Sequence, residues 1–228
     1  MPTRRFLAAL ATTLAIAPGM AVVTDVAAAP QAEAAAVTRT LRAAVRALPL
    51  ADEVRRGYDR DLFRHWIDAD GDGCDTRDEV LLQEARTKPR VYDRCTLVGG
   101  RWFSYYDARW TRQRTSFDID HLVPLAEAWD SGARRWRATT RKAFANDLGD
   151  RRSLVAVTAS SNRAKSDQDP TDWLPRPRVR CRYVAEWVAV KTRWRLSVDR
   201  TEKQTLARIA AGCPNVTIRV RRAPIALR

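Results

Sequence analysis

Histidine is scarce in this chain of 228 residues, which contains two, His65 and His121. Cysteine is limited to four residues, and no two of them have the C-x-x-C spacing of a structural zinc site. The histidines also lie far along the sequence from the cysteines, except for His65. These shortages argue against a zinc-binding protein, and they make the surroundings of each histidine informative.

Long hydrophobic runs are missing as well, and the apolar stretch from Phe6 to Pro18 is too short to span a bilayer. It follows Arg4-Arg5 and precedes small residues at 27–29, which is the layout of a secretory signal. We therefore predict a signal peptide at residues 1–29, with a second cleavage point near Ala34 to Ala36, and a secreted mature protein without a membrane segment. A twin-arginine signal is the alternative, although its phenylalanine stands one place too early.

The four cysteines agree with export. An even number of cysteines in a chain that meets an oxidising compartment predicts two disulfides. Their order favours two local pairs, Cys74 with Cys95 and Cys181 with Cys213. The spacing leaves the other two pairings open.

Acidic residues are outnumbered, because 41 Lys and Arg face 27 Asp and Glu, for a net charge of +14. Without residues 1–29 the chain keeps 39 basic and 26 acidic residues, a net charge of +13. Such an excess predicts a polyanionic partner, since each phosphate that Lys or Arg neutralises releases bound counterions. Nucleic acids and anionic wall polymers both fit this description, so charge alone does not separate them.

Hydrophobic periodicity predicts a mostly helical chain. Apolar residues at helical spacing and capping residues indicate helices at residues 37–50, about 58–67, 76–88 and two between 180 and 212. The third of these begins at a capping box formed by Thr76 and Glu79, and the last is capped by Asp199 and Glu202 and ends at Gly212. No internal repeat is present, and eight tryptophans are expected to anchor the core of one domain.

Three extended segments are expected between these helices. Residues 90–106 read as a β-hairpin that turns at Gly99-Gly100. Short strands are predicted at Phe117 to Asp120 and at Ser153 to Thr158. The second strand is followed by a helical or turn-like stretch from Ala159 to Ser166.

The run FDIDH, residues 117–121, places Asp118 and Asp120 directly before His121. Hydrolysis of a phosphodiester needs a base near neutral pH, a Lewis acid on the scissile oxygens and positive charge for the transition state. A strand that ends at Asp120 would let both Asp120 and His121 reach one pocket. Downstream, Asn162 offers a neutral oxygen ligand, and Arg163 and Lys165 offer positive charge.

These residues carry a resemblance to a known family. The run D-x-D-H-x-x-P, then a strand, then S-N-x-x-K-x-D, resembles the HNH endonuclease superfamily with its ββα-metal finger, and in particular secreted proteins with a DUF1524-type core. The likeness extends over roughly residues 50–213 and includes the segments HWIDADGDGCDTRDEVL, RKAFANDL and LVAVTASSNRAKSDQDPTDWLP.

The resemblance implies a role for each site residue. His121 would be the general base, Asp120 and Asn162 would bind the divalent metal, and Lys165 would lie near the phosphate. Asn146 would support the active-site loop, with Asp118 and Arg163 as further supporting residues. Because Asp120 and Asn162 stand where the letters H-N-H name histidines, the site is rich in oxygen, which favours Mg²⁺ or Mn²⁺ over zinc.

The resemblance also implies the organisation of the chain. We expect an α+β fold, a mostly helical domain around a ββα-metal finger with a β-hairpin, two C-terminal helices and two disulfides. A flexible lead-in and N-terminal helix at 30–49 would precede an HNH nuclease domain at 50–213, and a basic tail at 214–228 would follow. We expect the protein to act as a monomer.

A second motif lies upstream of the candidate active site. Asp68, Asp70, Asp72 and Glu79 have the D-x-D-x-D-G-x5-E spacing of a calcium-binding loop. The spacing predicts a structural Ca²⁺. The alternative is a glycine-rich turn held by Cys74, since Asp75 stands where such loops usually have an apolar residue.

Structural roles compete with the catalytic ones. His121 could be bonded to Asp118, Asn162 could be a helix cap, and Arg163 and Lys165 could belong to a solvated basic face. The sequence favours a secreted, metal-dependent endonuclease that cleaves DNA, and RNA as a further substrate, with low sequence specificity. The competing hypotheses are a catalytically silent protein that binds nucleic acid or anionic polymers, and a calcium-stabilised surface protein.

Overall fold

The computed structural model describes residues 36–228. The signal peptide predicted at residues 1–29 and the first part of the lead-in lie outside the described residues, so the structure does not bear on them. No helix within the described part of the chain is long and apolar enough to cross a membrane.

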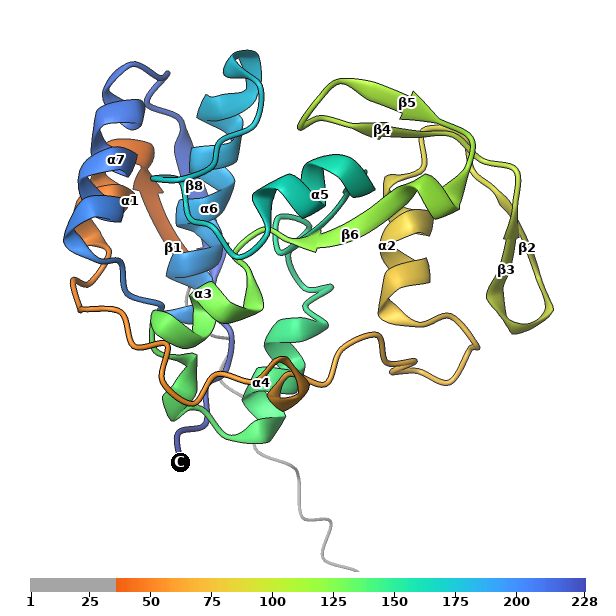
Figure 1. Ribbon diagram of the computed structural model, residues 1–228, viewed down its shortest axis with the longest axis horizontal. Helices are drawn as coiled ribbons and strands as arrows, with labels where there is room; N and C mark the ends of the chain where they lie inside the picture. Colours follow the sequence, from red (N-terminus) through yellow and green to blue (C-terminus); the bar gives the residue numbers. More distant parts are fainter. Residues whose placement is uncertain (1–35) are drawn as a thin grey trace, which may run out of the picture. The chain divides into compact units, whose positions relative to one another are not determined.

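Helices and short two-stranded sheets make up the described residues (Figure 1). The seven α-helices are α1 (Leu41–Ala47), α2 (Thr76–Glu84), α3 (Leu125–Asp130), α4 (Ala138–Ala145), α5 (Ala159–Lys165), α6 (Arg180–Trp194) and α7 (Arg200–Ala211). The strands are β1 (Ala36–Thr40), β2 (Arg90–Tyr92), β3 (Thr96–Val98), β4 (Trp102–Ser104), β5 (Arg109–Thr111), β6 (Phe117–His121), β7 (Leu154–Thr158) and β8 (Thr217–Arg221). They pair as β1–β8, β2–β3, β4–β5 and β6–β7, all antiparallel. This mixed architecture agrees with the predicted α+β class.

The pair β6–β7 lies between two hydrophobic clusters. The larger cluster joins α1, α3, α6 and α7, and the smaller one surrounds α2 and the disulfide Cys74–Cys95. Alternate residues of β7 belong to different clusters: Val155 and Val157 to the larger, Leu154 and Ala156 to the smaller. All five residues of β7 are buried for this reason, which explains the continuous apolar run in its sequence. Figure 1 shows β6 between the α1–α6–α7 group and α2.

The C-terminal helices fold as predicted. Residues Val184, Trp187, Val188 and Trp194 of α6 are at most 2 % exposed and face the larger cluster. The Asp199 side chain accepts a hydrogen bond from the Glu202 amide at the start of α7, and Gly212 ends that helix. Disulfides Cys181–Cys213 and Cys74–Cys95 both form, which confirms the local pairing.

The helix predicted at residues 58–67 is wrong. The structure has a single 3-10 turn at Arg60–Leu62, and the Asp59 side chain caps it by accepting from the Asp61 amide. Trp66 then takes a left-handed φ of 55°, and the Ile67 amide donates to the Asn146 side chain. The Ile67 amide thus has its hydrogen-bond partner 79 positions away in the chain. A partner so distant in sequence cannot be predicted from the local pattern of apolar residues.

The hairpin predicted at residues 90–106 is also wrong in its register. Two hairpins form, because β3 pairs back with β2 and β4 pairs forward with β5. The turn of the first lies at Arg94 and Cys95, which have positive φ and are held by the Cys74 disulfide. Gly99-Gly100 instead connects the hairpins, and a Cβ at Gly100 would come within 2.5 Å of the Trp102 ring.

Two helix starts differ from the prediction. The stretch before Leu41 is strand β1, because it pairs with β8 at the other end of the chain, and α1 covers only Leu41–Ala47. The cap of α2 is Asp75, whose side chain accepts from the Asp78 amide, so Thr76 and Glu79 form no capping box. The Thr76 hydroxyl donates to Ile67 and Asn146 instead.

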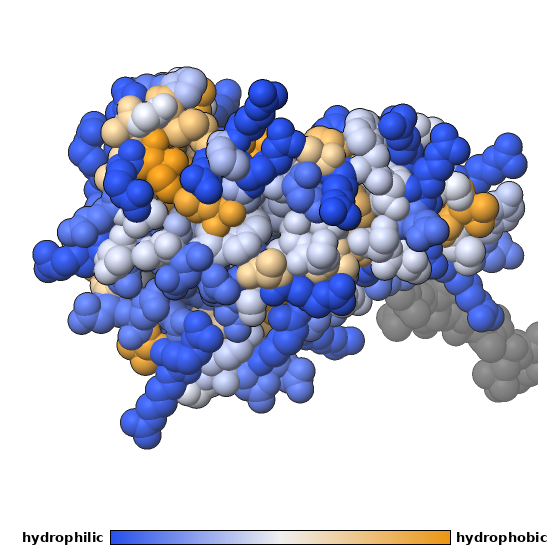
Figure 2. Space-filling model, turned by 45° about the horizontal axis from the view of Figure 1, so that its top comes forward, coloured by the Kyte–Doolittle hydropathy of each residue, from blue (hydrophilic) through white to orange (hydrophobic). Residues whose placement is uncertain are grey.

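The molecular surface is dominated by polar side chains, as Figure 2 shows for one face, where hydrophobic side chains form separate patches. The large apolar residues that are exposed include Val91, Tyr92 and Val98 on the β2–β3 hairpin, and residues elsewhere such as Trp110 and Val216. Such a surface fits a chain in which 30 % of residues are charged.

Candidate active site

Strand β6 carries the FDIDH run, and its last residue is His121. Side chains alternate along a strand, so Asp118 and Asp120 point to one face of the sheet. Their partners on β7, Val157 and Val155, point to the same face. Helix α5 follows β7 directly and packs on both strands, and the Thr158 side chain caps its first turn. Two antiparallel strands followed by a helix therefore bring Asp118, Asp120 and His121 to α5.

The Asp120 carboxylate is buried, at 5 % exposure, and each of its oxygens has a protein partner. The Tyr106 hydroxyl donates to Oδ2 at 2.6 Å, and the Lys165 ammonium donates to Oδ1 at 2.8 Å. Burial raises the pKa of Asp120, while Lys165 and Tyr106 act in the opposite direction. The two donors fix the plane of the carboxylate within the site.

The His121 ring is 6 % exposed and is bonded by one nitrogen, Nε2, to the Ala145 carbonyl at 2.8 Å. A carbonyl oxygen only accepts, so Nε2 carries the proton and Nδ1 is left with its lone pair. Burial lowers the pKa of His121 to about 3, which keeps the imidazole neutral. No hydrogen bond joins His121 to Asp118 among the described residues, and the Asp118 side chain accepts from Asn162 instead.

Asn162 lies within α5 and does not cap it, because Thr158 holds that position. Its Nδ2 donates to Asp118 Oδ2 at 3.1 Å. This bond orients the amide so that its oxygen faces away from Asp118. Asp118 thus touches the candidate metal ligand and positions it.

Lys165 differs from the expectation of a residue near the phosphate. Its side chain is 0 % exposed, and Nζ donates to Asp120 and to the His121 carbonyl at 3.0 Å. Burial lowers the pKa of Lys165, and Asp120 opposes that shift. Lys165 therefore connects the Asp120 side chain with the His121 backbone carbonyl.

A pocket of about 270 Å³ brings four of the predicted residues together, while Asp118, Asn146 and Lys165 do not line it. It is lined by Asp120, His121 and Asn162, and by the exposed cations Arg60 and Arg163. Arg60 was missed from the sequence because it lay in a segment assigned to a helix. Tyr106 was missed as well, since nothing in its own sequence context marks a bond to Asp120.

Asn146 fixes the segment that leads into the pocket. Its amide nitrogen donates to the Arg64 and Lys142 carbonyls, and its oxygen accepts from Ile67 and Thr76. One side chain thus ties the loop before α2 to α4, whose last residue, Ala145, supplies the carbonyl that orients His121.

The loop with calcium-site spacing gathers its acidic groups. Asp68, Asp70 and Asp72 each offer an oxygen within 4.8 Å of the others. Asp68 also accepts from the Gly71 and Gly73 amides, which shapes the loop. Burial and then the neighbouring aspartates raise the pKa of Glu79. Calcium binding by this loop stays a prediction from the spacing.

Comparison with known proteins identifies the family of this chain. Residues 75–209 match the model of the GmrSD restriction endonucleases, C-terminal domain, a range that contains every candidate residue from Asp118 to Lys165. An uncharacterized secreted protein of Arthroderma benhamiae is 43 % identical over 159 residues, which cover 69 % of this chain and 76 % of that protein. No solved structure matches. With more than half of its length inside the matched range, the chain belongs to the family of GmrSD restriction endonuclease C-terminal domains.

Proposed function

We propose that the protein is a secreted, metal-dependent endonuclease of the HNH type that hydrolyses phosphodiester bonds of DNA, and of RNA as a further substrate, with low sequence specificity. Membership of a restriction endonuclease family supports the reaction class. The single observation that carries the proposal is the pocket that Asp120, His121 and Asn162 line together.

His121 is the general base in this proposal. Its Nδ1 has no hydrogen-bond partner among the described residues, and its Nε2 proton is held by Ala145. A neutral imidazole in a fixed tautomer can take a proton from the attacking water.

Asp120 and Asn162 fit a divalent cation by the chemistry of their donors. A carboxylate oxygen and an amide oxygen are hard ligands, and two protein ligands leave room for water and phosphate, which is how Mg²⁺ and Mn²⁺ are usually held. When bound, the cation would supply charge to the scissile phosphate oxygens. The Asp118 bond presents the Asn162 oxygen, and Tyr106 and Lys165 hold Asp120 in place.

Arg60 and Arg163 are proposed to contact the phosphates, because both are exposed and line the pocket. Lys165 is assigned a positioning role instead, since it has no exposed surface. Arg163 also lines an adjoining pocket of about 470 Å³ with Arg109 and Trp110. Cationic side chains and an aromatic ring next to the site form a continuous surface for a nucleic acid. The cations would contact its phosphate backbone, and the ring would contact its bases.

Secretion is supported by two features. The described cysteines all form disulfides, which persist in oxidising compartments, and the relative from Arthroderma benhamiae carries the description secreted.

Incubation of the protein with supercoiled plasmid tests the function. We expect nicking in Mg²⁺ or Mn²⁺ that EDTA abolishes. His121→Ala is expected to lose roughly 10²- to 10⁴-fold in rate, the usual contribution of a general base. Binding of DNA by His121→Ala should remain and should weaken with salt, because the basic surface is unchanged.

His65→Ala is the matched control, since the centroid of the His65 ring lies 6.3 Å from that of His121. It is expected to cleave at close to the wild-type rate. Equal loss in both variants would contradict the assignment of the base. Binding without nicking in any metal would favour the alternative, a catalytically silent protein that binds nucleic acid or anionic polymers.

A further inference from the structure

One tryptophan does not belong to the core. All eight tryptophans lie within the described residues, and seven of them are buried or half-buried, whereas Trp110 on β5 is 49 % exposed. An exposed indole adds little to the stability of a fold, because hydrophobic stabilisation requires the removal of apolar surface from water. A single exposed aromatic residue is common on protein surfaces, so a function is indicated only by what surrounds it.

Two neighbours hold the Trp110 ring. Phe103 faces Trp110 across the β4–β5 pair, and their ring centroids lie 4.8 Å apart. The Arg101 guanidinium lies 4.0 Å from the centroid of the Trp110 ring. Side chains two residues apart on a strand point to one face, so Arg101, Phe103 and Trp110 share a face of the hairpin. These contacts restrict the ring without burying it, which lowers the entropy cost of binding a flat ligand.

Trp110 also lies next to the candidate active site. It lines the pocket of about 470 Å³ to which Arg109, Asp118 and Arg163 contribute. Asp118 stands two residues before Asp120 on β6, and Asp120 and Arg163 line the candidate active-site pocket. Two residues of a strand advance about 7 Å, a length that two stacked nucleotides cover at about 3.4 Å each. A polynucleotide that passes along β6 can therefore occupy both pockets.

The surroundings of Trp110 carry positive charge. Arg101, Arg109 and Arg163 are all exposed. Among the described residues that line the pocket, Asp118 is the one acidic residue. Exposed arginines attract phosphates, and their guanidinium planes also stack on bases. Cations around an exposed aromatic ring are the combination by which proteins bind single strands without sequence preference.

Base pairing decides whether a nucleic acid can use such a ring. Inside a duplex each base is stacked between its neighbours, so its face is not accessible to a side chain. An unpaired nucleotide exposes that face, and stacking on an aromatic side chain tolerates every base. A stacking site at Trp110 would therefore favour single strands over duplexes and fit cleavage with low sequence specificity.

We propose that Arg101 and Trp110 form a stacking site for an unpaired base, and that the preferred substrate of the protein is single-stranded nucleic acid. This proposal rests on the nuclease function proposed above and adds the substrate class to it. Supercoiled plasmid remains a substrate, because negative supercoiling favours local opening of the duplex. Relaxed duplex is expected to be cut more slowly than a single strand of the same sequence.

Binding in EDTA tests the stacking site separately from metal-dependent cleavage. Fluorescence anisotropy compares three labelled ligands: a single-stranded oligonucleotide, its duplex, and an abasic single strand of the same length. The wild type is expected to bind the single strand with bases most tightly. Trp110→Ala should weaken that binding by roughly 5- to 150-fold, the effect of losing one base-stacking side chain. Its binding to the duplex and to the abasic strand should equal that of the wild type, because neither ligand offers a base to the ring.

Three variants serve as controls. Tyr92→Ala is the matched one, because Tyr92 is 53 % exposed on the β2–β3 hairpin and lines neither pocket, and it should bind all three ligands like the wild type. Trp110→Phe should retain part of the affinity for the single strand, since phenylalanine keeps an aromatic face. Arg109→Ala should weaken binding of all three ligands and reduce the salt dependence, because it removes a contact to phosphate.

Equal affinity of the wild type for the single strand with bases and for the abasic strand would overturn the stacking site. A loss in Trp110→Ala that is the same for all three ligands would overturn it too, because that result assigns the ring to the structure of the hairpin. Cleavage separates this proposal from the proposed function. Base-dependent binding by a protein that cuts no nucleic acid in any metal would contradict the nuclease and keep the stacking site, whereas equal cleavage rates on single strand and relaxed duplex would contradict the substrate class alone.

Discussion

Two adjacent residues of β6 are held by different parts of the protein. Asp120 is held by Tyr106 and Lys165, and His121 is held by the Ala145 carbonyl at the end of α4. The opposite directions of neighbouring side chains on a strand make this division possible. The two side chains thus have separate hydrogen-bond partners, while Lys165 also donates to the backbone carbonyl of His121.

Asn162→Ala tests the proposed amide ligand. Loss of one of two protein oxygens should weaken the metal site, so we expect half-maximal cleavage to need roughly tenfold or more additional Mg²⁺. Cleavage should recover as Mg²⁺ is raised. Arg163→Ala, the neighbouring residue, should weaken DNA binding and leave the metal requirement unchanged; no recovery of Asn162→Ala at any Mg²⁺ concentration would favour a structural role.

Glu84 gives a prediction for pH. Burial raises its pKa from 4.5 to about 7, so the folded protein favours the neutral acid. Its contribution to stability is complete below pH 4.5 and is lost as pH rises through about 7. Glu84→Gln should therefore gain about 2 to 3 kcal/mol relative to wild type between pH 4 and pH 8.

Urea denaturation in EDTA at several pH values measures this gain. Asp61→Asn, which changes an exposed carboxyl, is the control. A difference between Glu84→Gln and wild type that stays constant with pH would show that the carboxyl does not titrate as the burial implies.

At the scale of elements, local signals predicted those segments whose partners are near in sequence. The helices α6 and α7 carry their own apolar stripes, α7 also has its own cap in Asp199, and α5 follows β7 without a loop. The strand β1 could not be predicted, because it pairs with β8 about 180 residues later. The turn at Cys95 could not either, since a disulfide to Cys74 holds it.

The distinction between near and distant partners also explains which residues of the candidate site could be predicted. That Asp120, His121 and Asn162 line one pocket could be predicted, because their residue types and spacing form a motif. Tyr106 and Arg60 could not, because they reach the pocket from segments whose positions depend on tertiary contacts. The burial of Lys165 was also hidden, since a lysine near an acidic motif is usually solvated.

The disulfide between α6 and α7 gives a prediction at this scale. It spans 32 residues, and closing a loop of that length lowers the entropy of the unfolded chain. Replacement of Cys181 and Cys213 by alanine should therefore cost about 3 to 4 kcal/mol of unfolding free energy. The fold should survive at room temperature, because the buried face of α6 is unchanged; an unaltered melting temperature would contradict this account.

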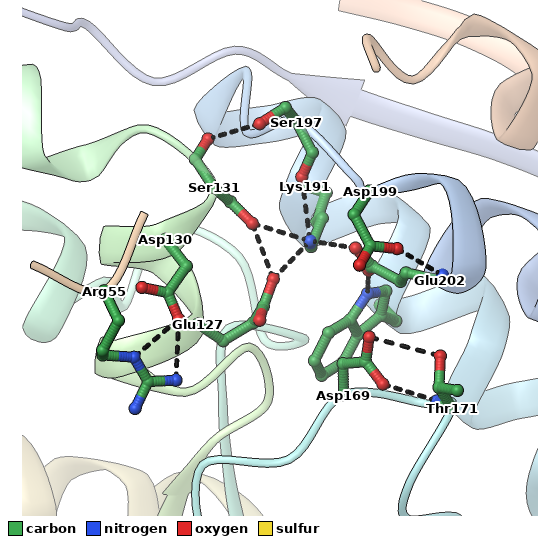
Figure 3. A network of polar contacts seen from close by, with 11 residues as sticks. Arg55, Glu127, Asp130, Ser131, Asp169, Thr171, Lys191, Ser197, Asp199 and Glu202 are labelled. Atoms are coloured by element: carbon green, nitrogen blue, oxygen red, sulfur yellow. Dashed lines mark hydrogen bonds and ion pairs between the residues drawn. The ribbon is translucent and has the colours of Figure 1, made fainter. Parts of the chain in front are cut away.

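At the scale of the whole molecule, two clusters of core residues flank the ββα unit that β6, β7 and α5 form within the described residues. Lys191 joins α3, α6 and α7 through Glu127, Ser131 and Glu202 in the larger cluster. Helix α3, which supplies Glu127 to this buried network (Figure 3), begins four residues after His121. The rigidity of the pocket is thus expected to depend on residues that never touch substrate.

The central claim is that an oxygen of Asp120 and the amide oxygen of Asn162 bind one cation beside Nδ1 of His121. A crystal soaked in Mn²⁺ and measured for anomalous scattering tests it most directly. We predict a peak at roughly 2.0 to 2.3 Å from both oxygens, with water in the remaining positions. Absence of that peak in a protein that cleaves plasmid in Mn²⁺, or a peak bound by other residues of the pocket, would contradict the account.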